Sequence, residues 1–329
     1  MKWKVFIFLF LILAIILLFE REVIGISNGP EKKIIVKSGE SASIICNKMN
    51  REGIIRFPLL LEAFMIIKGI DRNIKPGNHI FNVGESYFNI CDELIKERLD
   101  LLKITIPEGF TKKDIIKKLS NFWDIQTVLK AFSKIESEGI RFYGYQYHNS
   151  EGFLFPDTYK FTKTDNPEKI IRMMISHFDE VFRKCRKNAI DMNAYKQLIL
   201  ASIVEGEAKL DKEKPIIAGV FMNRLKKGMS LDSCATIEYV IKQCTGSRKK
   251  KLSNKDIKIN SPYNTYIIKG LPPAPICSPG RESIKAAMRP AKHDYLYFVS
   301  MGNFHHFSHS LREHDIWKRK AKIRANNKK

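Results

Sequence analysis

The chain has 329 residues, and 44% of them are hydrophobic, which is enough for a packed core and excludes disorder over most of the length. Lys and Arg number 57 against 35 Asp and Glu, and the resulting net charge of +22 favours polyanionic partners such as nucleic acid, anionic lipid or acidic cell-wall polymers. The basic residues are scattered, so a purely compositional origin of this charge stays open. None of the six cysteines forms a CxxC pair, which leaves zinc and thioredoxin-type motifs unsupported. We expect buried free thiols, with disulfides as the alternative.

The N-terminus is predicted to be a membrane anchor over residues 5–24, preceded by a cytoplasmic tail of residues 1–4. Val5–Phe19 is an unbroken apolar run that would span about 22 Å as a helix. A cleavable signal peptide is the rival interpretation, but the end of the run lacks an A-x-A-like cleavage site. Lys2 and Lys4 place the N-terminus in the cytoplasm and the body outside it, at the inner membrane. A body outside the cytoplasm meets no chromosome, so we expect no nucleic-acid partner.

The body is predicted to be α+β, because separate helical and strand patterns follow one another without a repeat. Strands are expected at Lys33–Lys37, Lys75–Phe81, Leu102–Ile106 and Tyr295–Ser300. Helices are expected at Ser41–Asn50, Arg56–Lys68, Lys112–Leu119, 167–187, 192–209 and Ser283–Ala287, with a mixture of helix and basic loop over Arg224–Leu252. A structured loop rich in proline and glycine is expected at Ser261–Gly280, and a basic tail at residues 319–329.

One predicted helix carries a carboxylate in an apolar stripe. In a helix over residues 191–210, Glu207 falls between Ile203 and Leu200, near the middle of the apolar face. Glu205 projects from the opposite side and is expected to be a solvated surface residue. Burial and the negative end of the helix dipole disfavour the charged form of a carboxyl group, and a protonated carboxyl is what a general acid needs. An ion pair in the core and an earlier helix end are the alternatives that helical phase leaves open.

Several sequence blocks resemble those of the YceG/MltG-like endolytic murein transglycosylases, in the family's order. The run LASIVEGEA (Leu200–Ala208) is similar to the signature helix of that family. The other blocks are EGFLFPDTY (Glu151–Tyr159), VFMNRLKKGMSL (Val220–Leu231), SPYNTYIIKGLPPAPICSPG (Ser261–Gly280), and PAKHDYLYFV (Pro290–Val299) with HHFS (His305–Ser308). Together they extend over nearly the whole chain beyond the predicted anchor.

The resemblance implies two modules after the anchor. A small LysM-like module would occupy residues 31–102, and a catalytic domain of mixed α/β structure would occupy residues 103–318. Lys33–Phe81 is similar to the first module in its pattern, and ITIPEGFTKKDIIKKL (Ile104–Leu119) resembles the entry to the catalytic part.

The resemblance also implies a reaction, the endolytic cleavage of the bond between N-acetylmuramic acid and N-acetylglucosamine in nascent peptidoglycan strands, which would limit strand length during wall assembly. One carboxyl protonates the leaving oxygen and then takes the proton of the sugar's own 6-hydroxyl, which attacks the anomeric carbon and leaves a 1,6-anhydro end. Such an enzyme needs no second carboxylate to activate water. The family's catalytic glutamate aligns with Glu207, and Glu205 is the fallback. No cofactor is implied, and penicillin-binding synthases and division proteins are candidate partners besides the glycan and the membrane lipid.

The loop block supplies most of the implied substrate-binding residues. Tyr263, Asn264 and Tyr266 would line the cleft, because their side chains offer hydrogen bonds and aromatic faces to sugars. A turn in which Asn264 binds its own backbone is the alternative.

The resemblance also implies Asn223 and Glu205, which lie in two helical blocks, as substrate-binding residues. Asn223 and Arg224 would brace the site, unless they serve only a helix surface and a salt bridge.

One departure from the family pattern bears on activity. Family members usually carry Asp-Pro-Thr after the GM-x-L block, and here the residues are Cys234, Ala235 and Thr236. The alternative function is therefore a catalytically weak or inactive glycan-binding scaffold of the wall-synthesis machinery. A basic protein that binds polyanions is a further alternative. No metal site is predicted, because the metal-like spacing of the histidines at 305, 306, 309 and 314 comes with no carboxylate or cysteine cluster.

Overall fold

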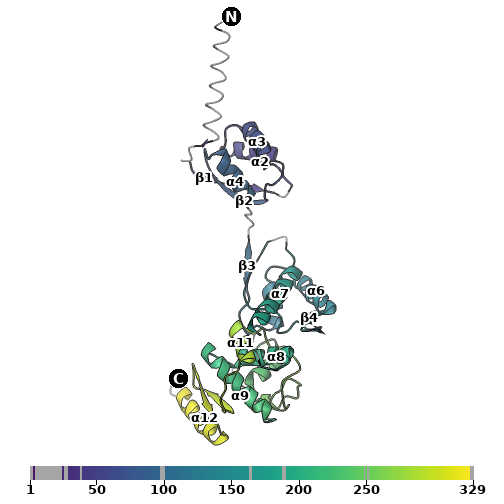
Figure 1. Cartoon of the computed structure of the whole chain (residues 1–329), viewed down its shortest axis with the longest axis vertical. Helices are drawn as coiled ribbons and strands as arrows, with labels where there is room; N and C mark the ends of the chain where they lie inside the picture. Colours follow the sequence, from purple (N-terminus) through teal and green to yellow (C-terminus); the bar gives the residue numbers. More distant parts are fainter. Residues whose placement is uncertain are drawn as a thin grey trace. The chain divides into compact units, whose positions relative to one another are not determined.

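The structure is a computed structural model of the chain, shown in Figure 1. It describes residues 3, 24–25, 29–37, 39–96, 101–162, 165–186, 190–247, 249 and 252–326. The predicted cytoplasmic tail and anchor lie almost entirely outside these ranges and stay a prediction. Within the described ranges, no helix combines the length and apolar character needed to cross a membrane. The contacts divide the chain into two compact units, unit 1 (Met1–Leu102) and unit 2 (Lys103–Lys329).

In the described part of unit 1, three helices and a two-stranded sheet pack around a core of their own. Its elements are β1 (Glu31–Val36), α2 (Ala42–Arg51), α3 (Pro58–Ile67), β2 (Gly77–Asn82) and α4 (Tyr87–Ile95). The two strands are antiparallel, with Glu31 opposite Asn82 and Val36 opposite Gly77. Strand β1 begins two residues before the prediction, and α4 was not predicted. The core of this unit contains residues from all five elements, among them Ile45, Leu61, Phe81 and Ile90.

Unit 2 is mostly helical and holds short strand pairs. Its elements, with strand β3 leading into it, are β3 (Leu102–Thr105), α5 (Lys112–Leu119), α6 (Ile125–Glu138), β4 (Ile140–Phe142), β5 (Tyr145–Tyr147), β6 (Thr158–Phe161), α7 (Pro167–Cys185), α8 (Ala194–Glu207), α9 (Lys214–Lys226), α10 (Cys234–Thr245), α11 (Arg281–Met288), β7 (Tyr297–Ser300), β8 (His305–Ser308) and α12 (Leu311–Asn326). The strands pair as β3 with β6, β4 with β5 and β7 with β8. The α+β prediction is therefore confirmed.

The helix starts follow local capping chemistry. Helix α5 has the predicted bounds because Thr111 and Asp114 form a capping box, in which each side chain accepts the other residue's backbone N–H. Helix α8 starts at Ala194 because the Asn193 side chain accepts the N–H groups of Tyr195 and Lys196.

The basic C-terminal segment differs from the prediction of a separate tail. Helix α12 runs unbroken from Leu311 to Asn326, so the predicted boundary at residue 318 falls inside it. The helix packs along the β7–β8 hairpin, where the Trp317 ring stacks on His306 at a centroid distance of 3.7 Å. This tertiary contact supports a helix in a segment whose charge alone predicted a tail.

The cysteines agree only partly with the prediction of buried free thiols. All six are free, and Cys46, Cys91, Cys185 and Cys277 are buried. Cys234 and Cys244 are exposed, which the sequence did not predict.

Helix α8 lies at the centre of unit 2. Helices α9, α10 and α11 all pack against it, and α11 and α9 lie beside it in Figure 1. Its buried residues are Ala194 and the continuous run Gln197–Val204. The predicted division into one apolar and one solvated face is therefore wrong for this run, because neighbours cover it on every side.

Candidate active site

The last residue of α8 is Glu207, and its carboxylate faces the start of α10. The Oε1 atom accepts hydrogen bonds from Ser233 Oγ at 2.5 Å and from the backbone N–H of Ala235 at 3.0 Å. The N-terminus of a helix carries a partial positive charge, so the carboxylate lies where an anion is stabilised. The side chain of Ser233 makes no capping hydrogen bond of its own to α10. Glu207 thus supplies the cap from another helix and is partly exposed, so the prediction that it lies buried in an apolar face is wrong.

The close approach of α8 and α10 depends on a glycine. A Cβ atom built on Gly206 would lie 2.6 Å from the Cβ of Ala235, which is closer than real contacts allow. Any side chain at residue 206 would therefore push α10 away from the Glu207 carboxylate. The small residues at 206 and 235 set the distance between the carboxylate and its backbone donor.

The loop over residues 261–280 is fastened to the same end of α10. Thr265 and Thr236 are fully buried, and their hydroxyl oxygens lie 2.9 Å apart. Thr265 Oγ1 also accepts the N–H of Ser233 at 3.0 Å. The loop contains no helix or strand, as predicted, and these contacts hold it beside the carboxylate.

Asn264 occupies a different position from the one that the resemblance implies. It is fully buried, and its amide donates to the carbonyls of Ile257 and Ile259 at 3.0 and 2.7 Å. Its carbonyl oxygen accepts the N–H of Tyr266 at 3.0 Å. These contacts favour the alternative, in which Asn264 holds its own loop.

The two loop tyrosines are partly exposed on either side of Asn264. Tyr266 places its hydroxyl 3.1 Å from the thiol of Cys234, and desolvation raises the pKa of this tyrosine. The Tyr263 ring lies 5.1 Å from the ring of Tyr239 on α10, measured between centroids. Both tyrosines thus lie along the N-terminal half of the helix that faces Glu207.

A buried carboxyl behind Tyr239 escaped the sequence reasoning. Glu151 is 2% exposed and accepts the N–H of Lys112 at 2.9 Å and the hydroxyl of Tyr239 at 3.4 Å. Burial raises the pKa of Glu151 to about 7. Its block, EGFLFPDTY, contributed to the resemblance, but nothing in a single sequence shows that the carboxyl is buried.

Glu205 is not the solvated residue that its helical phase predicted. Its side chain is 9% exposed, and Oε2 accepts hydrogen bonds from the N–H of Gly280 at 3.0 Å and from Ser283 Oγ at 2.6 Å. The buried ammonium of Lys214 lies 3.4 Å from the same oxygen and 2.9 Å from Asp211. Glu205 is therefore enclosed in an ion pair that joins α8 to α9 and to the start of α11.

Asn223 and Arg224 on α9 bind backbone carbonyls of residues 293–296, and within the described residues no contact of theirs reaches Glu207, so their predicted role of bracing the site stays a prediction. Asn223 donates to the backbone carbonyls of His293 and Tyr295 at 2.8 and 3.0 Å. Arg224 donates to the carbonyl of Leu296 at 2.6 Å and pairs with a carboxylate of the adjacent loop at 2.7 Å. Both side chains bind protein groups.

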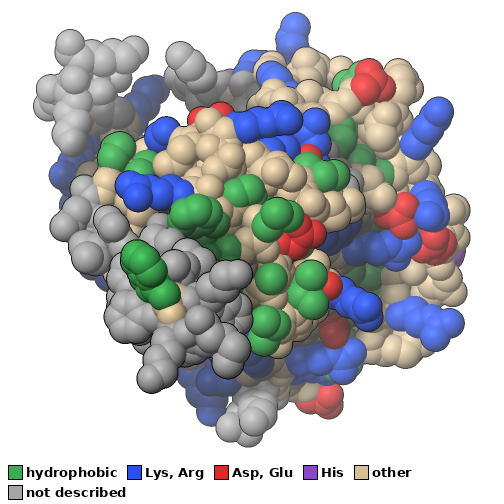
Figure 2. Space-filling view, turned by 90° about the horizontal axis from the view of Figure 1, so that it is seen from above, with side chains coloured by type: hydrophobic (Ala, Val, Ile, Leu, Met, Phe, Trp, Pro, Cys, Tyr) green, Lys and Arg blue, Asp and Glu red, His purple; other side chains and the backbone are tan. Residues whose placement is uncertain are grey.

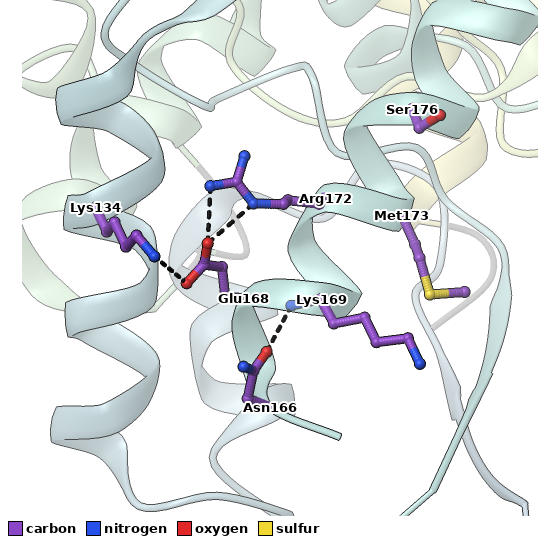
Figure 3. Close-up of a pocket in the computed structure, with 7 residues that line it drawn as sticks. All are labelled: Lys134, Asn166, Glu168, Lys169, Arg172, Met173 and Ser176. Atoms are coloured by element: carbon purple, nitrogen blue, oxygen red, sulfur yellow. Dashed lines mark hydrogen bonds and ion pairs between the residues drawn. The ribbon is translucent and has the colours of Figure 1, made fainter. Parts of the chain in front are cut away.

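The cavities do not coincide with the carboxylate. A cavity of about 620 Å³ lies on α6 and α7, and Figure 3 shows that Glu168 pairs there with Lys134 and Arg172. The space beside Gly206 and Ala235 measures about 20 Å³, room for a single water molecule.

Comparison with known proteins agrees with the motifs. The sequence profile of the YceG-like family matches residues 34–320. The chain belongs to the YceG-like family. Its match includes α8, α10 and the 261–280 loop, and so all the groups around Glu207.

Named relatives of this YceG-like protein come from three organisms. The endolytic murein transglycosylase of Bacillus subtilis (strain 168) is 32% identical over 87% of the chain and 84% of its own length. That of Streptococcus pneumoniae serotype 2 is 27% identical over 80% of the chain and 53% of its own length. A crystal structure of a yceG-like protein from Listeria monocytogenes superposes with a TM-score of 0.58 at 30% identity, over 87% of this chain and 98% of that one.

The departure from the family pattern lies directly at the site. Cys234 is the first residue of α10 and is exposed beside Tyr266, while Ala235 contributes the backbone N–H that Glu207 accepts. Desolvation, followed by the charge of Glu207, raises the pKa of the Cys234 thiol. In this YceG-like protein the replacement leaves the backbone donor in place.

Proposed function

We propose that this protein is an endolytic peptidoglycan transglycosylase with Glu207 as its catalytic residue. The observation that carries the proposal is the placement of the Glu207 carboxylate, held by Ser233 and the Ala235 N–H at the partly exposed end of α8. The names of the Bacillus and Streptococcus relatives support the substrate class.

In the proposed reaction Glu207 acts first as an acid and then as a base. It donates its proton to the glycosidic oxygen while the bond from that oxygen to the anomeric carbon of N-acetylmuramic acid breaks. The donors Ser233 and Ala235 stabilise the carboxylate that results. The carboxylate then takes the proton of the 6-hydroxyl as that oxygen bonds to the anomeric carbon, so the products are a 1,6-anhydro end and a new N-acetylglucosamine end.

A single carboxylate suffices for this sequence, and the neighbouring one is unsuited to a second role. Oε2 of Glu205 is bound to Lys214, Gly280 and Ser283, so this carboxylate is committed to an ion pair and to the packing of α8. The arrangement favours an intramolecular nucleophile over the hydrolytic mechanism with two carboxylates.

Substrate contacts are assigned to the two exposed loop tyrosines. Tyr263 and Tyr266 lie beside the N-terminal half of α10, and we assign the partly exposed parts of their rings to contact with a bound sugar. Asn264, Asn223 and Glu205 are assigned a positioning role, because their polar atoms bind other protein groups.

Unit 1 and the N-terminus complete the proposal. The order strand, helix, helix, strand at the start of unit 1, with its strands paired antiparallel and the further helix α4 behind them, supports a LysM-like glycan-binding module. An anchor over residues 5–24 would hold the chain in the inner membrane with both units outside the cytoplasm, close to penicillin-binding synthases and division proteins. There, cleavage would limit the length of nascent strands.

The test is digestion of purified sacculi by the full chain in detergent, followed by mass spectrometry of the released muropeptides and sizing of the glycan strands. We expect anhydro-ended products and shortened strands with the wild type and none with Glu207→Gln. Reducing ends would indicate a hydrolase instead. An inactive wild type would favour the scaffold that the Cys234 and Ala235 replacements suggest.

A further inference from the structure

Helix α3 of unit 1 is apolar on both of its sides. Leu61, Phe64 and Met65 are buried in the core of the unit. The opposite side is exposed, with Leu59 and Ile67 each 80% and Ile66 59% accessible to solvent. Helices that are apolar all round are normally buried on all sides, so this surface calls for a partner.

These exposed residues form one continuous stripe, which we call the α3 face: Leu59, Ala63, Ile66 and Ile67. At about 100° per residue, positions spaced by four, seven and eight residues lie on one side of a helix. None of these four residues is charged, and the partly exposed Glu62 lies beside Ile66 at the border of the stripe. Isolated exposed hydrophobic residues are common on protein surfaces, but a complete uncharged helix face is not.

Phe88 on α4 is a further exposed apolar side chain beside α3. This residue is 47% exposed, and its ring meets the buried Phe64 edge to face at a centroid distance of 5.0 Å. The ammonium of Lys68 lies 4.9 Å from the Phe88 centroid. Exposed apolar side chains are thus present on both α3 and α4.

Cations border this surface. Arg56 precedes α3, Lys68 follows it, and Arg72 lies in the next turn, all three exposed. Figure 2 shows exposed hydrophobic side chains lying among Lys and Arg side chains, with some Asp and Glu, on one face of the molecule. Four uncharged side chains with three exposed cations beside them fit the interface of an anionic bilayer, where apolar side chains enter the acyl boundary and cations remain at the headgroups.

The chain length before unit 1 is compatible with such contact. Six residues separate the end of the predicted anchor at residue 24 from Glu31, the first residue of β1. Six extended residues reach at most about 20 Å, so an anchored chain would keep unit 1 next to the headgroups.

We propose that unit 1 docks on an anionic lipid surface through the α3 face and Phe88. Docking would restrict the orientation of unit 1, which an anchor alone would leave free to turn. The lipid composition of the membrane would then affect the orientation in which unit 1 faces the wall. The proposal rests on the surface of unit 1 and does not depend on the chemistry of Glu207.

The test uses the full chain reconstituted into vesicles of phosphatidylcholine with 30% phosphatidylglycerol, a composition chosen as roughly that of an anionic membrane. Ile67→Trp places a fluorophore on the α3 face, and Ile35→Trp, at another exposed apolar position, is the matched control. With lipids brominated in the acyl chains, we expect Ile67→Trp to add strong quenching to that of the native tryptophans and Ile35→Trp to add little. Equal or absent additional quenching would overturn the proposal.

Two further measurements distinguish docking on lipid from the effect of the anchor alone and from contact with a second copy of the chain. Flotation of the full chain with Ile66→Asp and Ile67→Asp after carbonate washing tests the anchor, because an anchored chain floats whether or not the α3 face docks. Adding Lys68→Glu to the Ile67→Trp chain should weaken docking on the anionic vesicles. We expect the association constant for docking, measured by the quenching, to fall by about five-fold per unit of charge at low salt. In pure phosphatidylcholine the same change should have no effect. Protection of the introduced tryptophan that rises with protein concentration and ignores lipid bromination would identify a second copy as the occupant and overturn lipid docking.

Discussion

Two carboxylates on the last turn of α8, Glu205 and Glu207, have contrasting surroundings. Glu205 is enclosed, with the buried Lys214 ammonium and two hydrogen-bond donors at one oxygen. Glu207 is partly exposed and accepts hydrogen bonds from two neutral donors, a hydroxyl and a backbone N–H. A carboxylate that is fixed by a buried cation serves packing. A carboxylate that is held by neutral donors and is partly exposed can exchange a proton with a substrate.

The largest change in activity is expected from replacing Glu207. Glu207→Gln should lower kcat on sacculi by about 10²- to 10⁴-fold, because a general acid is lost, with little change in thermal unfolding since Gln can still accept the Ala235 N–H. Muropeptide release and a melting curve measure the two effects. Activity within about ten-fold of wild type would remove Glu207 from the mechanism.

A third carboxyl, that of Glu151, is buried more deeply and offers a second contrast. Because burial raises the pKa of Glu151 from its ordinary 4.5 to about 7, the folded chain binds more protons than the unfolded one between those values. The stability that Glu151 contributes is complete below pH 4.5 and is lost as pH rises through 7, by up to about 3 kcal/mol. Glu151→Gln should flatten this dependence in melting curves from about pH 4.5 to 8. Glu282→Gln, at an exposed ion pair, is the control, and an unchanged slope in Glu151→Gln would contradict the expectation.

Replacing Glu205 should lower stability and leave the reaction intact, which is the opposite of the effect expected from replacing Glu207. Glu205→Gln weakens the link to Lys214, which retains Asp211, and should lower the free energy of unfolding by about 1–3 kcal/mol. The folded fraction should still produce anhydro ends at room temperature. If Glu205→Gln instead folded normally and lost all activity, the two carboxylates would have to exchange roles.

The contact between α8 and α10 can be altered without touching a polar group. Gly206→Ala should lower kcat roughly ten-fold, because the added methyl group meets Ala235 and moves the backbone donor away from Glu207. Ala235→Gly in the same chain should restore most of the loss. Failure of this rescue would mean that Gly206 acts by some other route.

The smallest effect is expected at the residue that departs from the family pattern. Cys234→Ala removes an exposed thiol but keeps the backbone of α10, so we expect less than about a three-fold change in kcat. A loss as large as that of Glu207→Gln would give the thiol a direct role.

Several elements of the fold could be predicted from local signals. Helix α5 matched its predicted bounds because Thr111 and Asp114 form a capping box that is visible in the sequence. The α12 helix was missed because its stability depends on contact with the β7–β8 hairpin, which lies outside any local window. Local chemistry predicts where helices start better than it predicts how far packing extends them.

The residues of the candidate site were likewise predictable only in part from the sequence. The sequence by itself singled out Glu207 and the loop at 261–280, because their blocks resemble those of a known family. Only the tertiary structure decided that Glu205 is ion-paired, that Asn264 is buried, and that Glu151 lies behind Tyr239. Helical phase assumes one face in solvent, but the run Gln197–Val204 of α8 is buried on all sides. Burial and charge pairing at the two carboxylates that follow this run therefore depend on groups from distant parts of the chain.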